Sequence, residues 1–381
     1  MTGYSMVSRS PCFWFIDKRS ILGCMKADID IIRQAREYLA ENAALRQAVG
    51  AADGVVLEPR SLGAGEHNLN YWFSEPASGS KYVLRVNVLP QPFHDNQVAY
   101  EFAALEALAS SGCTPLPVFL DDSPAALGEG VIVETFCEGD MLDFDHLQPG
   151  DLECAARLMA DVHAVPVAAD CPLFKPRDPL RALYDECLQR FRLYRASAFE
   201  DERLTQWVEK FIAVIERWLG MSTYPATDCQ HIINTETLPS HFILPRKGAD
   251  HTVGVGAFID WERPIVGEVA QDVAYFVSPT STFWDSDWLC PANMAEQVVD
   301  DYWRAVDGRF DRGNFDERFQ LYRAMTVLRS TTWCCRALIR YNQEGAYKTG
   351  RTVEKLPVYL SDDFLARLYE ECFIEARFRS L

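Results

Sequence analysis

The hydrophobic pattern of this chain changes at Gly139. Before it, short apolar runs between turn residues predict strands at 55–57, 70–73, 82–87, 118–120 and 131–136. One helical pattern at 96–110 interrupts these strands, and another at 27–48 precedes them. After it, helical patterns dominate, at 150–164, 178–195, 202–220, 268–277, 293–307, 315–344 and 362–378. The pattern therefore predicts an α+β fold in which a small antiparallel sheet with one inserted helix precedes a larger, mainly α-helical part.

A chain of 381 residues exceeds the usual size of a single hydrophobic core, so we expect two lobes. We assign residues 27–138 to the N-terminal lobe and residues 139–381 to the C-terminal lobe, with a hinge near 137–142. Residues 1–26 are expected to be a disordered leader, because their apolar run is too short and badly flanked for a secretory signal.

Composition excludes several classes of protein. The net charge of −18 argues against a general nucleic-acid binder, which needs basic surface to meet phosphates. No apolar run approaches the roughly 20 residues that a membrane span requires. The twelve cysteines form no CxxC pair and no zinc-ligand spacing, which favours buried thiols in a reducing cytoplasm. Nothing in the sequence indicates an oligomeric state.

Two short segments within the helical half carry a group of chemically active side chains. Glu236 lies in a polar loop, His241 follows five residues later, and Asp260 ends the next predicted strand. Phosphoryl transfer uses this layout, with one carboxylate orienting the attacking hydroxyl and other groups holding Mg²⁺. We assign Glu236 as the base and His241 and Asp260 as metal ligands, although imidazole is an unusual ligand for Mg²⁺. The plain alternatives are a loop or cap residue at 236 and a hydrogen-bonded strand residue at 241.

The N-terminal half offers partners for a phosphate. Gly63 and Gly65 lie between two strands, where glycine lets backbone N–H groups approach phosphate oxygens. Arg85 interrupts an apolar strand and, if it faces inward, needs a partner, for which Glu101 on the next helix is the natural candidate. A strand cation tied to a helix glutamate is the kinase arrangement. Alternatively the glycines form an ordinary turn and Arg85 points to solvent.

Two further polar residues are expected to be structural. Asp272 stands near the start of a predicted helix, where it would cap the helix or pin the loop around Glu236. His163 ends a helix, where a histidine interacts favourably with the helix dipole.

Together these residues resemble the aminoglycoside phosphotransferase/choline kinase family, a branch of the protein-kinase-like fold, over roughly residues 53–345. In that resemblance the loop 63–66 looks like the nucleotide loop. Arg85 looks like the phosphate-binding cation, and Glu101 looks like its helix partner. Segment 133–139, with Glu134 and Phe136, is similar to the hinge that receives adenine through backbone groups. Three sequence matches carry the rest: 158–166 to "LARLHALP", 260–262 to "IDWE", and 267–272 to "GDPxxDLA".

The loop around Glu236 departs from the family's usual HGDLHPGN. Asn234, Thr235, Glu236 and His241 stand where the family has the first His, the Gly, the Asp and the Asn. The carboxylate is kept but is one methylene longer, and an imidazole replaces the amide.

The resemblance implies a cytoplasmic, ATP- and Mg²⁺-dependent phosphotransferase acting on a hydroxyl of an aminoglycoside-like compound, an amino alcohol or a sugar. The acceptor would bind between the catalytic hairpin and the C-terminal helices. A cationic ligand is one expectation, because acidic residues occur there, at Asp285, Asp287, Asp300 and Asp301. Two alternatives stay open: a nucleotide-binding pseudokinase that acts as a regulatory module, and a metal-dependent hydrolase using Glu236, His241 and Asp260.

Overall fold

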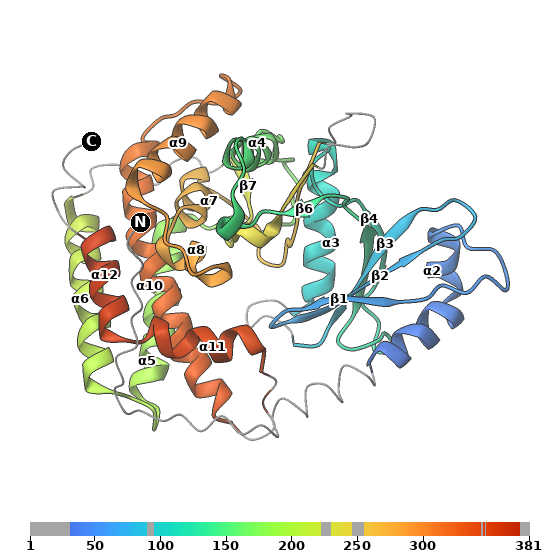
Figure 1. Cartoon of the computed structure of the whole chain (residues 1–381), viewed down its shortest axis with the longest axis horizontal. Helices are drawn as coiled ribbons and strands as arrows, with labels where there is room; N and C mark the ends of the chain where they lie inside the picture. The colour runs from blue at the N-terminus through green and yellow to red at the C-terminus, as the bar shows by residue number, and fades with distance from the viewer. Residues whose placement is uncertain are drawn as a thin grey trace.

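The computed structural model describes residues 31–89, 95–221, 230–245, 255–343, 346 and 348–373. Its N-terminal part is a five-stranded antiparallel sheet of order β1-β2-β3-β5-β4 (Figure 1). The strands are β1 (Arg60–Ala64), β2 (Asn68–Ser74), β3 (Lys81–Asn87), β4 (Pro117–Asp121) and β5 (Val131–Thr135).

Helices cover the two faces of this sheet differently. The helical residues 31–41 and α2 (Ala43–Ala48) lie on the outer face, while α3 (Gln97–Leu108) lies between the sheet and the helical part of the molecule (Figure 1). Leu84 and Val86 of β3 join the outer hydrophobic cluster. Because strand side chains alternate between faces, Arg85 points to the inner face. The alternation thus places a cation in the space between the sheet and the helices.

The C-terminal part is built around the long helix α10 (Phe315–Tyr341), which contacts α5, α6 and α7 (Figure 1). The other helices are α4 (Asp151–His163), α5 (Pro179–Arg195), α6 (Glu202–Met221), α7 (Val269–Phe276), α8 (Pro279–Asp285), α9 (Ala292–Val306), α11 (Gly350–Tyr359) and α12 (Asp362–Cys372). One hydrophobic cluster unites them, and it also takes in apolar residues of α3. The inserted helix therefore ties the sheet to the larger core.

Short strands carry the two chemically active segments. β7 (His231–Ile233) pairs antiparallel with β10 (Ile265–Gly267). β8 (Phe242–Leu244) lies between β6 (Asp140–Met141) and β9 (Ala257–Phe258). The loop after β7 and the loop after β9 consequently emerge side by side.

The predicted α+β architecture is confirmed, with exceptions. Residues 55–57 are not a strand, because Val56 is 71% exposed and has no strand partner in the described part of the chain. The helix predicted over 27–48 breaks at Asn42, whose side chain accepts the Leu45 amide and starts α2. Helices α8 and α11 were not predicted. The leader 1–26 lies outside the described residues, and no described helix is long and apolar enough to cross a bilayer.

Candidate active site

The predicted site residues meet around Arg85. One of its nitrogens, Nη2, lies 2.8 Å from Glu101 Oε1, 2.8 Å from Asp260 Oδ1 and 3.4 Å from Glu262 Oε1. These partners come from α3 and from the loop after β9, so a single guanidinium bridges the sheet, the inserted helix and that loop. The predicted pairing of Arg85 with Glu101 is present, and Arg85 does not point to solvent.

A fourth carboxyl group faces the same space. Glu134 lies opposite Val83 in the β3–β5 ladder, and Val83 shares its face of β3 with Arg85. Glu134 is only 6% exposed and makes no hydrogen bond or ion pair with another described residue. Arg85 is therefore one cation among four carboxyl groups.

This crowding moves the proton equilibria of the cluster. Burial, with the nearby Asp260 charge, raises the pKa of Glu101 to about 7, and burial with Glu101 and Asp260 raises the pKa of Glu134 to about 8. Burial and Asp260 also hold the pKa of Glu262 well above its usual value. The pKa of Asp260 stays low despite its burial, because Arg85 and His241 favour the carboxylate. Of these carboxyl groups, Asp260 is the one whose surroundings favour the ionised form.

The cluster, which we call the carboxylate cluster (Glu101, Glu134, Asp260 and Glu262), offers oxygen atoms of the kind that a divalent cation binds. Its carboxyl groups outnumber the one guanidinium, and carboxylate oxygens are the ligands that Mg²⁺ prefers. Among the described residues, however, no three His, Cys, Asp or Glu side chains converge as a complete ligand set. Nucleotide phosphates and water would have to complete the coordination shell, and the metal-dependent hydrolase alternative loses its ligand set.

His241 lies beside Asp260, and among the described residues the two do not belong to a set of three metal-ligating side chains. Its Nε2 is 3.2 Å from Asp260 Oδ2, and its buried Nδ1 has no hydrogen-bond partner in the part of the chain that the structure describes. Through the contact of its Nε2 with Oδ2, the His241 imidazole can orient the Asp260 carboxylate.

The loop that carries Glu236 is held by a buried carboxylate. Asp272 of α7 accepts the backbone N–H groups of Asn234 and Thr235, at 2.7 and 2.8 Å. His163 in turn contacts Asp272, with 3.2 Å between Nε2 and Oδ2. The predicted role of Asp272 in pinning this loop is therefore present, and His163, expected only to end a helix favourably, supports Asp272 directly. The Asn234 amide also donates to the backbone oxygen of Asp260, at 2.7 Å, and so links the two active loops.

Thr235 adopts an uncommon backbone conformation, with φ of 71°. This left-handed region disfavours β-branched residues and suits glycine, which the resembled family has at this position. The backbone N–H of Thr235 donates to Asp272, and its backbone C=O accepts from Arg329. The Thr235 hydroxyl donates to the backbone oxygen of Arg263, at 3.0 Å. These contacts hold the loop in shape without glycine.

Glu236 lies among arginines. Its Oε1 is 2.5 Å from Arg329 Nη2 and 3.6 Å from Arg263 Nη1. Burial alone would raise the pKa of Glu236, but Arg329 and Arg263 lower it, so the side chain is a carboxylate. Sequence reasoning missed Arg263 and Arg329.

The nucleotide-loop candidate is bound to the far side of the cleft by Glu66. Its Oε1 accepts from Tyr341, Thr349 and Thr352, at 2.5, 2.7 and 2.5 Å, and its Oε2 pairs with Arg340. Gly65 N–H closes the hairpin on the Asn68 oxygen, at 2.9 Å. Space beside the two glycines is open, since an added Cβ would meet no atom within 4 Å at Gly63 and one at 3.7 Å at Gly65.

The two hinge candidates, Glu134 and Phe136, differ in which of their polar groups remain free to bind a nucleotide. The Phe136 N–H donates to the Lys81 oxygen at 3.1 Å, and its ring lies 6.1 Å from that of Trp72. That amide is therefore not free for a nucleobase. The carboxyl group of Glu134, predicted to contribute only backbone, instead faces the cleft.

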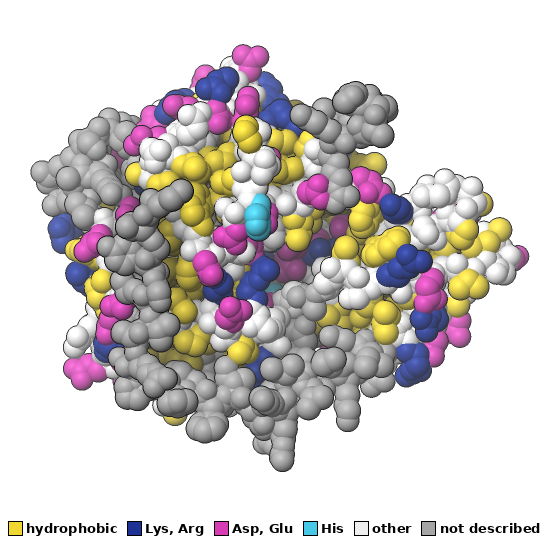
Figure 2. Space-filling view, viewed as in Figure 1, with side chains coloured by type: hydrophobic (Ala, Val, Ile, Leu, Met, Phe, Trp, Pro, Cys, Tyr) yellow, Lys and Arg dark blue, Asp and Glu magenta, His cyan; other side chains and the backbone are white. Residues whose placement is uncertain are grey.

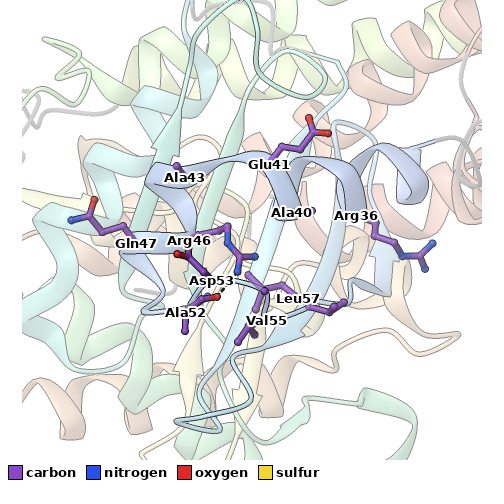
Figure 3. A pocket seen from close by; sticks show the side chains of 13 residues that line it. Arg36, Ala40, Glu41, Ala43, Arg46, Gln47, Ala52, Asp53, Val55 and Leu57 are labelled. Carbon is purple, nitrogen blue, oxygen red and sulfur yellow. Dashed lines mark hydrogen bonds between the residues drawn. The ribbon is translucent and has the colours of Figure 1, made fainter.

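Figure 2 shows acidic and basic side chains gathered in the hollow between the sheet and the helical part. A second concave surface, of about 810 Å³, lies on the outer side of the sheet and is lined by residues 36–57 (Figure 3). None of the predicted site residues lines it.

The fold and the site define a protein-kinase-like small-molecule phosphotransferase. The sequence model of the phosphotransferase enzyme family matches residues 58–317, which is more than half of the chain, and the chain belongs to this family. A search of curated proteins finds no significant relative.

Solved structures share the fold at low identity. A putative aminoglycoside phosphotransferase from Ralstonia eutropha is 13% identical, covering 87% of this chain and 98% of its own, with a TM-score of 0.59. Choline kinase from Cryptosporidium parvum is 13% identical, covering 92% and 98%, with a TM-score of 0.58. Spectinomycin phosphotransferase, solved with ADP and spectinomycin, is 12% identical, covering 88% and 96%, with a TM-score of 0.56.

Proposed function

We propose that the chain transfers the γ-phosphoryl group of ATP to a hydroxyl of a small molecule, with lobe 27–138 binding the nucleotide and lobe 139–381 the acceptor. The observation that carries the proposal is the pair of 2.8 Å contacts from Arg85 to Glu101 and to Asp260. A strand cation held by a helix carboxylate next to a second, ionised carboxylate is the arrangement that positions nucleotide phosphates for transfer.

On the nucleotide side, Arg85 would bind phosphate oxygens and Glu101 would fix its orientation. The open space beside Gly63 and Gly65 lets the loop's backbone approach the phosphates. The nucleobase would lie against the hinge 133–139, where Glu134 presents a carboxyl group without a partner among the described residues.

On the acceptor side, Glu236 would accept the hydroxyl proton. The bond from the γ-phosphorus to the bridging oxygen breaks, and ADP leaves with that electron pair. A new bond forms between the phosphorus and the acceptor oxygen. Arg329 and Arg263 keep Glu236 ionised, so it is ready to receive the proton at neutral pH.

Asp260, supported by Glu262, would hold Mg²⁺, which when bound neutralises phosphate charge. His241 would orient Asp260 through its Nε2 contact. We keep the reducing cytoplasm as the proposed location, and the buried thiols of Cys334 and Cys335 agree with it.

The charge of the acceptor does not follow from the acidic residues near the C-terminal helices. Asp285 is bound by Arg351, Asp287 by Lys355, and Asp301 by Arg304. Three of the four carboxylates that indicated a cationic ligand are thus already neutralised.

The test is Mg²⁺-dependent ATP consumption over a panel of aminoglycosides, amino alcohols, sugars and hydroxy acids, first ranked by thermal shift with and without Mg-ATP. Asp260→Asn should reduce turnover by at least about 10³-fold while the unfolding temperature stays near that of the wild type. Asp300→Asn, at an exposed position on α9, is the matched control.

Undiminished turnover in Asp260→Asn would refute the metal assignment. ATP binding without turnover of any compound would instead favour the pseudokinase alternative.

A further inference from the structure

We propose that the acceptor carries an anionic group, a carboxylate or a phosphate, and that this group binds an arginine surface beside the proposed base. The arginine surface consists of Arg263, Arg329, Arg336 and Arg340. This inference rests on the proposed function, since it names the class of acceptor for the same site.

Three of these arginines form one stripe on α10. Arg329, Arg336 and Arg340 stand at positions i, i+7 and i+11, which places them within about 40° around the helix axis. Arg329 contacts Glu236 at one end of the stripe, and Arg340 contacts Glu66 of the nucleotide loop at the other. The stripe therefore follows the cleft from the base to the nucleotide loop.

Positive charge exceeds negative charge along this stripe. The arginine surface and the neighbouring Arg190 supply five guanidinium groups. The carboxylates in contact with them are three: Glu66, Glu186 and Glu236. The guanidinium groups thus outnumber the carboxylates that the structure shows in contact with them, in a chain whose net charge is −18. An excess against the overall charge of the molecule indicates a local requirement for an anion.

Two arginines have guanidinium N–H groups without an acceptor among the described residues, which is where the excess of positive charge is visible. Arg336 is half-buried and makes no hydrogen bond or ion pair within the described ranges, and burial with the charge of Arg340 lowers its pKa. Arg190 is 4% exposed, and its Nε and Nη1 have no acceptor among the described residues. Buried guanidinium donors without acceptors are costly, and a carboxylate or phosphate supplies acceptors in the geometry that arginine prefers.

The position of the stripe assigns the anion to the acceptor. Nucleotide phosphates have a cation of their own, Arg85, on the opposite side of the cleft. Arg329 and Arg263 touch Glu236, which receives the acceptor's proton, so an anion on the arginine surface lies within one side-chain length of the reacting hydroxyl. A small hydroxy acid or a phosphorylated polyol has that spacing.

The first experiment measures kcat/KM for ATP-dependent phosphorylation of compounds paired by a single group: hydroxy acids with their amides, phosphorylated with free polyols, and both with amino alcohols. Anionic members are expected to exceed their neutral and cationic counterparts by at least about 10-fold. The carboxylate and phosphate arms distinguish the two sources of charge. Equal or better use of neutral or cationic members overturns the inference while leaving the proposed function intact.

The second experiment titrates inorganic phosphate into the nucleotide-free protein and follows binding by calorimetry. Arg336→Gln is the chosen variant because no described contact depends on Arg336. It should weaken phosphate binding by at least about 10-fold and leave Mg-ADP affinity within about twofold. Arg367→Gln, at an exposed position of α12, should change neither.

Phosphate binding that Arg336→Gln does not alter, or an equal loss of Mg-ADP affinity, overturns the inference, because the arginines would then serve no anion or the nucleotide. Failure of the wild type to bind Mg-ATP refutes the proposed function alone, since the phosphate titration still tests the arginine surface.

Discussion

The two sides of the cleft have opposite charge imbalances. Around Arg85, one guanidinium faces the four carboxyl groups of the carboxylate cluster. Around Glu236, three carboxylates face five arginines. The carboxyl groups around Arg85 can reduce their excess of negative charge by binding protons, as the raised pKa values of Glu101 and Glu134 indicate. Arginine has no such route at ordinary pH, so the second group keeps its charge.

Each side of the cleft is therefore electrostatically incomplete in its own way. A divalent cation would complete the carboxylate cluster, and an anion would complete the arginine surface. The two ligands of a phosphoryl transfer therefore have separate electrostatic counterparts within one cleft, and each side can be perturbed independently.

Removing Arg329 should have the largest effect, because the arginine side depends on it. Among the described residues, Arg329→Met leaves Glu236 with the 3.6 Å contact to Arg263 and removes the donor to the Thr235 oxygen. Since Glu236 is about one-third exposed, we expect a loss near the lower end for broken buried pairs, about 3 kcal/mol, measured by denaturant unfolding.

The control is Arg195→Met, which breaks an exposed pair with Glu209 and should cost under about 1 kcal/mol. Equal losses in the two variants would mean that Arg329 is an ordinary surface cation.

Neutralising the base should affect catalysis more than nucleotide binding. Glu236→Gln removes the proton acceptor, so kcat should fall by about 10²-fold or more while Mg-ADP affinity changes little. Steady-state kinetics and calorimetry measure the two quantities. A parallel loss of both would show that Glu236 binds the nucleotide and does not act as the base.

Changing the pH tests the carboxylate side. Between about pH 5 and 8, Glu101 and Glu134 hold more protons in the folded chain than in the unfolded chain, because folding raises their pKa from 4.5 to about 7 and about 8. The free energy of unfolding of the nucleotide-free protein should therefore fall as pH rises through this window.

Glu134→Gln mimics the protonated side chain and should reduce this slope, as should added Mg-ADP. Glu138→Gln, at an exposed position, should preserve it. A free energy of unfolding that rises with pH would contradict the crowding of the cluster.

The smallest effect is expected at Thr235. Thr235→Gly relieves the positive φ but loses the hydroxyl bond to Arg263 and gains chain entropy on unfolding, so the net change should be within about 1 kcal/mol. Thr235→Ala loses the same bond and keeps the strained φ, so it should be less stable than the glycine variant. The reverse order would show that the backbone at 235 is not strained.

Much of this arrangement could be predicted from sequence because it depends on local pattern. The change of periodicity at Gly139 predicts the two kinds of architecture, and a lone arginine in an apolar strand predicts a buried partner, which is Glu101. The sequence also predicts that Asp260 ends a strand beside the active loop, but β9 stops at Phe258 and Asp260 lies in the loop that follows. The roles of these residues in catalysis stay predictions.

The arginine surface escaped prediction for a physical reason. Its members are brought together by tertiary packing of α10 against the loop between β9 and β10, and Arg263 and Arg329 are 66 positions apart in the sequence. The signal that existed was the spacing of Arg329, Arg336 and Arg340 on a helix whose other residues are mostly buried. Likewise, only strand register reveals that Glu134 faces the cleft.

The contacts of Glu66 have a consequence for the entry and release of the nucleotide. Four side chains, from α10, from α11 and from the residue that caps α11, hold Glu66, and Glu66 belongs to the loop that would cover the nucleotide. If ATP binds under this loop, it would have to enter while Glu66 stays bound, or after the contacts of Glu66 have broken. Exchange of ADP for ATP would then be slower than arrival of the acceptor, and detachment of Glu66 would set the pace of repeated turnovers.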